Sequence, residues 1–268
     1  MAAMTPEQQS LIARLQAHLE ADPRVEALWL GGSLGRGAGD EYSDVDLIAL
    51  VADGKAIGTG QTYGRDLGQS IPCVIVRPLF GGGVVTVVTE AWERFDISFV
   101  EPAGLDRFDP SEIKNLFNRG ERQPSPRVAT PYRTSPETLG PMIEEFFRIL
   151  GLMVLSLGRE EYLLGLSGIG FMRQLTLDLM LEENGIGPMS RGGALSRRPL
   201  LTPQQLAALD GLATVSADRE GIIRGNLDLA RIFVPRARRL AAEIGLDWPQ
   251  ALEDAVRRHL KGQLDLVW

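Results

Sequence analysis

Two aspartates, Asp44 and Asp46, stand two positions apart at the start of the apolar segment Val45–Val51. Alternate side chains of a strand share a face, so we predict that both carboxylates point the same way, with their backbones roughly 6.5–7 Å apart. At a separation of ~5 Å and an effective dielectric near 20, they repel each other by on the order of 3 kcal/mol. A divalent cation removes this repulsion, and Mg²⁺ prefers carboxylate, water and phosphate oxygens. The spacing therefore predicts a Mg²⁺ site.

A third carboxylate, Asp96, interrupts the apolar segment Phe95–Val100. Alternation places the segment's aromatic and aliphatic side chains on one face and Asp96 on the other, and aspartate is disfavoured in strands. A salt bridge to Arg94 is one explanation. The other is a neighbouring strand that carries Asp44 and Asp46. Three carboxylates can hold two metal ions ~3.5–4 Å apart, the arrangement used for in-line phosphoryl displacement.

The glycine-rich stretch GGSLGRGAGDEYSDVDL, residues 31–47, leads into the first two aspartates. It lacks the lysine of a Walker A loop, and its glycines do not have the spacing of a dinucleotide-binding fingerprint. If a helical turn begins at Ser33, its hydroxyl and the nearby N–H groups face a triphosphate, with Arg36 as the nearest cation. The simpler alternatives are that Ser33 is a helix N-cap and Arg36 a surface residue.

Residues 1–105 predict an α+β domain. A capping box at Thr5 starts an amphipathic helix, and the middle of the glycine-dotted connection 54–68 is open between loop and helix. The last two of the expected strands are close enough in sequence to form a hairpin. The expected strands are Val25–Leu30, Val45–Val51, Ile71–Arg77, Val84–Thr89 and Phe95–Val100.

The character of the sequence changes after residue 105. Residues 106–141 are polar and proline-rich, so we expect a linker with one short helix near Ile113–Phe117. Residues 142–268 have helical periodicity throughout and predict a helical bundle. A second capping box begins at Thr202, and Ile222–Ile244 reads as one long helix containing Pro235.

The amino-acid composition limits the kinds of partner that we expect for the chain. The net charge is −7 and the sequence pI is about 5.1, so electrostatics disfavour nucleic acid and anionic membranes as partners. The longest apolar run has nine positions, Ile149–Leu157, which is far short of the ~20 residues of a membrane-spanning helix. The lone cysteine, Cys73, excludes an intrachain disulfide, and we expect a cytoplasmic protein.

Together these residues resemble a known superfamily. Gly32-Ser33, then Asp44-x-Asp46 eleven positions after the serine, and Asp96 on a later strand are similar to the nucleotidyltransferase fold of the DNA polymerase β superfamily. A catalytic domain followed by a helical bundle resembles the bacterial aminoglycoside and lincosamide nucleotidyltransferases. The motif similarity covers residues 25–105, and over 106–268 the resemblance is one of architecture alone.

The resemblance implies that the chain moves a nucleoside monophosphate, AMP from ATP, to a hydroxyl group of a small molecule such as an antibiotic and releases pyrophosphate. Asp44 and Asp46 would bind Mg²⁺, and two ions are expected. Asp96 would bind the catalytic metal or accept the hydroxyl proton. Gly32 and Ser33 would hold the β- and γ-phosphates.

Two other functions stay open at this point. One is a nucleotidyltransferase that modifies protein or tRNA, as a toxin does, although the acidic pI argues against tRNA. The other is a catalytically silent nucleotide-binding module. The three carboxylates argue against the silent module, because such a domain has no need of facing aspartates.

Overall fold

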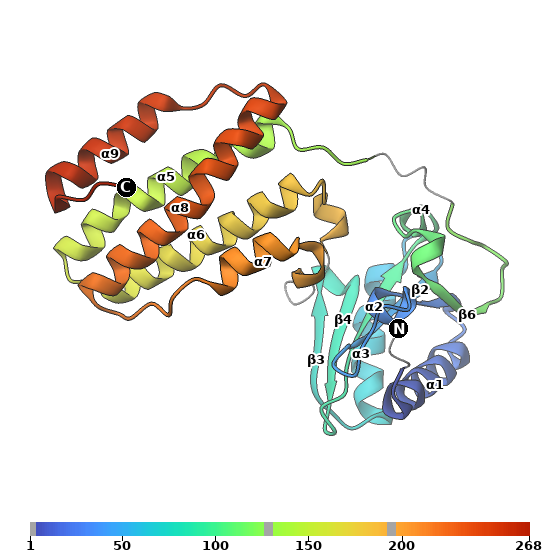
Figure 1. The fold of residues 1–268 in the computed structure, drawn as a ribbon. Helices are drawn as coiled ribbons and strands as arrows, with labels where there is room; N and C mark the ends of the chain where they lie inside the picture. The colour runs from blue at the N-terminus through green and yellow to red at the C-terminus, as the bar shows by residue number, and fades with distance from the viewer. Residues whose placement is uncertain (1–3, 126–130, 192–196) are drawn as a thin grey trace. The chain divides into compact units, whose positions relative to one another are not determined.

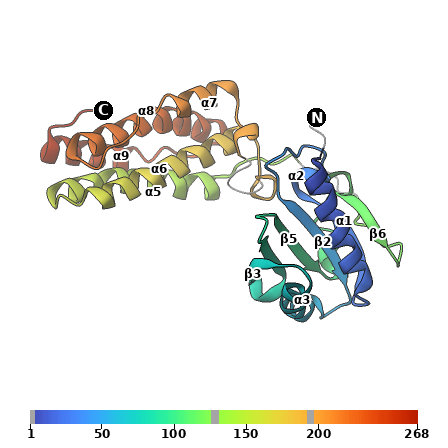
Figure 2. The ribbon, with the colours of Figure 1, turned by 90° about the horizontal axis from the view of Figure 1, so that it is seen from below.

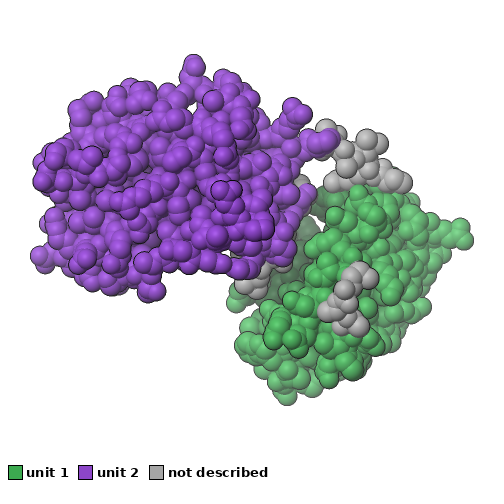
Figure 3. Space-filling view, viewed as in Figure 1, with its two compact units in different colours: residues 1–129 green, residues 130–268 purple. Residues whose placement is uncertain are grey.

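The computed structural model describes residues 4–125, 131–191 and 197–268. The chain divides into two compact units, residues 1–129 and 130–268, coloured green and purple in Figure 3. The first unit is a mixed sheet with helices and the second is helical (Figure 1). The expected α+β class with a helical region after it is confirmed.

The first unit is built on one six-stranded sheet with the order β3-β4-β5-β2-β1-β6. Of the described strand pairs, only β2 and β5 run parallel. The strands are β1 Val25–Leu30, β2 Val45–Val51, β3 Cys73–Leu79, β4 Val84–Thr89, β5 Arg94–Val100 and β6 Lys114–Asn118. The α-helices are α1 Pro6–Ala21, α2 Gly32–Gly35, α3 Ala56–Ser70 and α4 Pro102–Leu105, with short 3₁₀ turns at Phe80–Gly82 and Pro110–Glu112.

Helices α1 and α3 cover one face of the sheet (Figure 2). The capping box at Thr5 is confirmed: its side chain accepts a hydrogen bond from the Gln8 N–H, and the Gln8 side chain bonds back to Thr5. Leu15 of α1 and Tyr63 of α3 are buried against the alternate residues of the central strands. This face therefore carries the main core of the unit.

A smaller apolar cluster covers the opposite face of the sheet over β1, β2 and the end of β5. Leu105 of α4, with Phe108 and Ile113, packs there on Trp29 and Ile48. Along β4 and the first part of β5, the residues of this face are half-buried, whereas Val100 at the end of β5 is buried. The first unit thus leaves one end of this face accessible.

The segment 114–118 forms a strand where we expected a short helix, so that prediction was wrong. β6 pairs antiparallel with β1, with Phe117 opposite Leu28. Phe117 is buried while Lys114 and Asn115 are exposed. The N–H and C=O groups along the free side of β1 need hydrogen-bond partners, and this tertiary demand outweighs the weak local preference.

The second unit is a bundle in which α5 packs against α6, α8 and α9 (Figure 1). The Phe146 ring of α5 stacks on Phe233 of α8 with centroids 3.8 Å apart. The capping box at Thr202 and the uninterrupted helix through Pro235 are both present. The helices are α5 Pro136–Gly158, α6 Tyr162–Glu183, α7 Pro203–Asp210, α8 Arg219–Ile244 and α9 Gln250–Leu264, with 3₁₀ turns at Pro188–Ser190 and Arg198–Leu200.

A buried carboxylate joins α9 to α8. Glu253 is almost completely buried and accepts hydrogen bonds from Arg238, from Trp248 Nε1 at 2.7 Å and from Arg257 Nε at 2.9 Å. Its charge is therefore compensated by two guanidinium groups. Across the described helices of both units, none is long and apolar enough to cross a membrane.

Candidate active site

Strands β2 and β5 bring two of the expected carboxylates side by side. In the parallel register Asp46 lies opposite Asp96, and neighbouring strands are about 4.8 Å apart. Both residues are half-buried, and Asp44 is exposed immediately before β2. Their flanking residues, Val45 and Phe95 among them, point to the main core. The alternation expected from the sequence is therefore present in both strands.

The glycine turn after β1 lies directly against Asp46. The Gly31 N–H donates to the Asp46 carbonyl oxygen at 2.8 Å. Gly32 has a φ of +59°, and a Cβ placed there would be 1.8 Å from Asp46 Oδ2. Position 32 therefore requires glycine for two reasons, its left-handed backbone and its contact with the carboxylate.

Ser33 and Arg36 lie on the one-turn helix α2, beside this turn. Gly31 is the N-cap of α2, so the alternative that Ser33 acts as the N-cap is wrong. Ser33 is half-buried. Arg36 is exposed at the C-cap, and its positive charge lowers the pKa of Asp46.

Burial and repulsion between charges hold the carboxylates of Asp46 and Asp96 closer to neutrality than usual. Burial, reinforced by the charges of Asp44 and Asp96, raises the pKa of Asp46 from 3.8 to about 6. Burial also raises the pKa of Asp96, against a hydrogen bond from the Thr86 hydroxyl that lowers it. These are the two largest effects on Asp96, and repulsion from Asp44 adds to the increase.

No basic side chain within the described ranges forms a salt bridge with these three aspartates. Arg94, the alternative partner for Asp96, instead donates to the Tyr42 carbonyl oxygen at 2.7 Å. Among the described residues, the exposed Arg36 is the basic group that offsets the repulsion at Asp46.

The three carboxylates are ligands of the chemical type that a hard divalent cation prefers. Carboxylate oxygens are preferred Mg²⁺ ligands, and a bound cation would remove the repulsion that raises the pKa of Asp46. The three side chains are not gathered into one coordination sphere: within the part of the chain that the structure describes, no group of three His, Cys, Asp or Glu residues is arranged to hold a metal ion. Asp44 is exposed, so its carboxylate has room to turn toward Asp46.

Thr86 is a site residue that the sequence analysis did not identify. It lies opposite Asp96 in the β4–β5 register, and its hydroxyl bonds to that carboxylate. The signal was available, because a hairpin register through residues 90–93 pairs the two positions. Trp92, at the tip of this hairpin, has a side chain that is 72% exposed and a φ of +63°.

No protein-family model matches the chain, and no curated protein is similar to it. Among solved structures, the chain is similar to an aminoglycoside 6-adenyltransferase from Bacillus subtilis, with 14% identity over 95% of this chain and 97% of that one and a TM-score of 0.46. It is also similar to a nucleotidyltransferase-like protein from Exiguobacterium sibiricum, with 13% identity over 97% and 88% and a TM-score of 0.36.

A third similar structure is the Thermotoga maritima CCA-adding enzyme complexed with tRNA, with 10% identity over 98% and 93% of the two chains and a TM-score of 0.32. Identities of 10–14% and TM-scores below 0.5 are too low to assign this chain to a family.

Proposed function

We propose that the protein is a Mg²⁺-dependent nucleotidyltransferase that moves AMP from ATP to a hydroxyl group of a small molecule and releases pyrophosphate. The observation that carries this proposal is the register of β2 and β5, which sets Asp46 opposite Asp96, with Asp44 two residues before Asp46. A glycine turn packs against the same carboxylate. A purely structural sheet gains nothing from placing these charges together, because they repel each other.

In this proposal Asp44 and Asp46 hold Mg²⁺, and Asp96 either completes a second metal site or accepts the proton of the attacking hydroxyl. Two bound ions would neutralise the phosphates and orient the attacking and leaving oxygens in line. Gly32 and Ser33, at the N-terminal turn of α2, hold the β- and γ-phosphates, and Arg36 adds a positive charge beside them. The Thr86 hydroxyl keeps Asp96 in place.

We further propose that the acceptor is a small hydroxyl-bearing molecule, of the kind that includes antibiotics, and not a nucleic acid. The support is the net charge of −7, which weakens any attraction to a polyanion. A cytoplasmic location accords with the single cysteine, Cys73.

The first test is thermal unfolding with Mg²⁺ and each nucleoside triphosphate in turn. A ligand at 100 times its dissociation constant raises the free energy of unfolding by about 2.7 kcal/mol. We expect the largest rise in melting temperature with Mg·ATP. No rise with any Mg-nucleotide in a folded sample would refute the proposal. Radiolabelled ATP, carrying the label in its α-phosphate, then identifies acceptors in a screen of hydroxyl-bearing compounds.

The substitution Asp46→Asn tests the assigned chemistry. It removes a metal ligand, so we expect nucleotidyl transfer to be lost while the metal-free protein keeps its fold or gains stability, because the like-charge repulsion is relieved. Asp53→Asn, at an exposed turn beyond the other end of β2, is the matched control and should keep full activity. If Asp46→Asn still transferred nucleotide, the assignment of Asp46 as a metal ligand would be wrong.

A further inference from the structure

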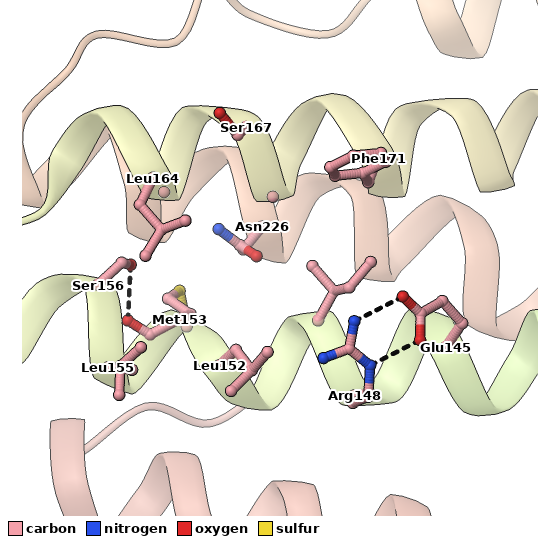
Figure 4. Close-up of a pocket in the computed structure, with 13 residues that line it drawn as sticks. Glu145, Arg148, Leu152, Met153, Leu155, Ser156, Leu164, Ser167, Phe171 and Asn226 are labelled. Atoms are coloured by element: carbon pink, nitrogen blue, oxygen red, sulfur yellow. Dashed lines mark hydrogen bonds and ion pairs between the residues drawn. The ribbon is translucent and has the colours of Figure 1, made fainter.

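A cavity of about 290 Å³ lies within the second unit, between α5, α6 and α8 (Figure 4). Its lining residues run from Glu145 to Ser156 on α5 and from Leu164 to Phe171 on α6, with Asn226 contributed by α8. All of them belong to residues 130–268.

Two glycines of α6 shape the packing of the helices around the cavity. A Cβ at Gly165 would be 2.9 Å from Ile222 Cδ1, so glycine there lets α6 approach α8 closely. A Cβ at Gly168 would make only an ordinary contact, 3.4 Å, with Ile149 Cγ2. A side chain would thus fit at position 168, and its absence leaves part of the cavity open.

The rim of the cavity is apolar and accessible to solvent. The exposed fractions are 44% for Leu152, 50% for Leu164 and 63% for Phe171. Figure 4 shows these three side chains at the gap between α5 and α6. Clusters of exposed apolar side chains around a concavity are typical of sites that bind an apolar partner or ligand.

The polar groups of the cavity have already used protons to bond their own helices. Ser156 Oγ donates to the Met153 carbonyl at 2.9 Å, and Ser167 Oγ donates to the Leu163 carbonyl at 3.2 Å. Asn226 is only 3% exposed, and its Nδ2 donates to the Ile222 carbonyl at 2.8 Å. Because a carbonyl can only accept, this bond fixes the orientation of the amide and leaves Oδ1 on the other side.

Asn226 Oδ1 accepts no hydrogen bond from any residue in the ranges 4–125, 131–191 and 197–268. The oxygen belongs to a residue that lines the cavity, so a molecule in the cavity can donate a hydrogen bond to it. The two serine hydroxyls likewise retain only acceptor lone pairs. Away from the exposed Glu145–Arg148 pair, Asn226 Oδ1 therefore offers an acceptor in an apolar surround, which a complementary molecule can satisfy with a donor.

We propose that this cavity binds a small molecule with an apolar, ring-sized body and one hydroxyl or N–H group that donates to Asn226 Oδ1. Such sites are mostly apolar, and a few placed polar groups fix the orientation of the ligand. The Glu145–Arg148 ion pair borders one end of the cavity on its exposed side. All of the residues that line the site belong to the second unit. The proposal does not depend on the proposed nucleotidyl transfer.

The test uses the full chain and a matched pair of probes, 2-naphthol and 2-methoxynaphthalene. Both have the same apolar body, but only naphthol can donate a hydrogen bond. By isothermal titration calorimetry we expect naphthol to bind about threefold to tenfold more tightly, the value of one net hydrogen bond. Asn226→Leu should make the two affinities equal, because it removes the acceptor and keeps the volume.

Gly168→Leu fills the cavity and should abolish the binding of both probes. Gly170→Leu is the matched control: it makes the same change on the same helix, at an exposed position with open space around it, and it should bind both probes as the unmodified chain does. Thermal melting of the two variants checks that each is folded.

Three results would overturn the proposal: binding of both probes with equal affinity, binding that survives in folded Gly168→Leu, or no binding of either probe to the unmodified chain. Analytical ultracentrifugation tests the other possible occupant of the cavity, a second copy of the chain. A dimer that dissociates in Gly168→Leu but not in Gly170→Leu would assign the cavity to a contact between two copies of the chain, and would also overturn the proposal.

Discussion

At Asp46, burial and two neighbouring charges act on one carboxylate in the same direction. Its pKa of about 6 in the folded protein exceeds the value of 3.8 for an exposed aspartate. The folded state therefore holds its proton more tightly than the unfolded state does. Stability from this group is present at low pH and is lost as the pH rises from about 4 to above 6.

This gives a prediction for the metal-free protein. Relative to Asp46→Asn, the unmodified chain should lose about 2–3 kcal/mol of unfolding free energy between pH 4 and pH 7, because the variant has no carboxylate to ionise at this position. Urea unfolding of both proteins in a chelator measures the difference. A gap between the two proteins that does not change with pH would contradict the prediction. Mg²⁺ at pH 7 should restore part of the loss.

A comparison of alanine substitutions at Gly32 and Gly37 separates the effect of the contact with Asp46 from the effect of backbone strain. Both have positive φ, +59° and +69°, so alanine at either position costs about 1–2 kcal/mol for the left-handed conformation. Only at position 32 does a Cβ meet another group, Asp46 Oδ2. We expect Gly32→Ala to be less stable than Gly37→Ala by at least about 1 kcal/mol in urea unfolding. Equal losses of unfolding free energy in the two variants would show that the turn at Gly32 does not pack tightly against the Asp46 carboxylate.

Strand alternation alone predicted that Asp46 and Asp96 face the same side of the sheet, because the period of two is a local property. It could not predict that they lie opposite each other, since register depends on how distant strands pair.

At the scale of elements, the attachment of α9 depends on one buried carboxylate. Glu253 is held by Arg238, Trp248 and Arg257. We expect Glu253→Ala to lower the free energy of unfolding by about 1–3 kcal/mol, because the Trp248 N–H and two half-exposed guanidinium groups lose their acceptor. The next residue is the control: Asp254 accepts a bond from Gln250, an exposed i, i+4 pair, and Asp254→Ala should cost under about 1 kcal/mol. Comparable losses for the two variants would contradict this role for Glu253.

Elements with strong local sequence patterns were predicted correctly, whereas one element with a weak local pattern was not. The capping boxes at Thr5 and Thr202 are short-range patterns with a defined geometry, and both are present. β6 is a five-residue edge strand whose partner, β1, is distant in the sequence. Its conformation is set by that pairing and by the burial of Phe117, so no local window identifies it.

At the scale of the whole molecule, each compact unit has its own apolar core. We expect residues 1–129 and 130–268 to fold as separate chains, each with a cooperative thermal transition in circular dichroism. A chain of residues 1–105 lacks β6 and leaves one side of β1 unpaired, so it should melt at a lower temperature than 1–129 or aggregate. Equal melting temperatures for the two N-terminal chains would show that β6 is dispensable.

The parallel pairing of β2 with β5 also has a consequence for the order of folding events. Asp96 follows Asp46 by fifty positions, and α3, β3 and β4 lie between their strands. Closing so long a loop carries an entropic cost, and non-local strand pairing is slow. The carboxylates therefore meet only when the centre of the sheet is complete. During refolding, the proposed nucleotide binding should return together with the slowest phase of sheet formation, well after the helices have formed.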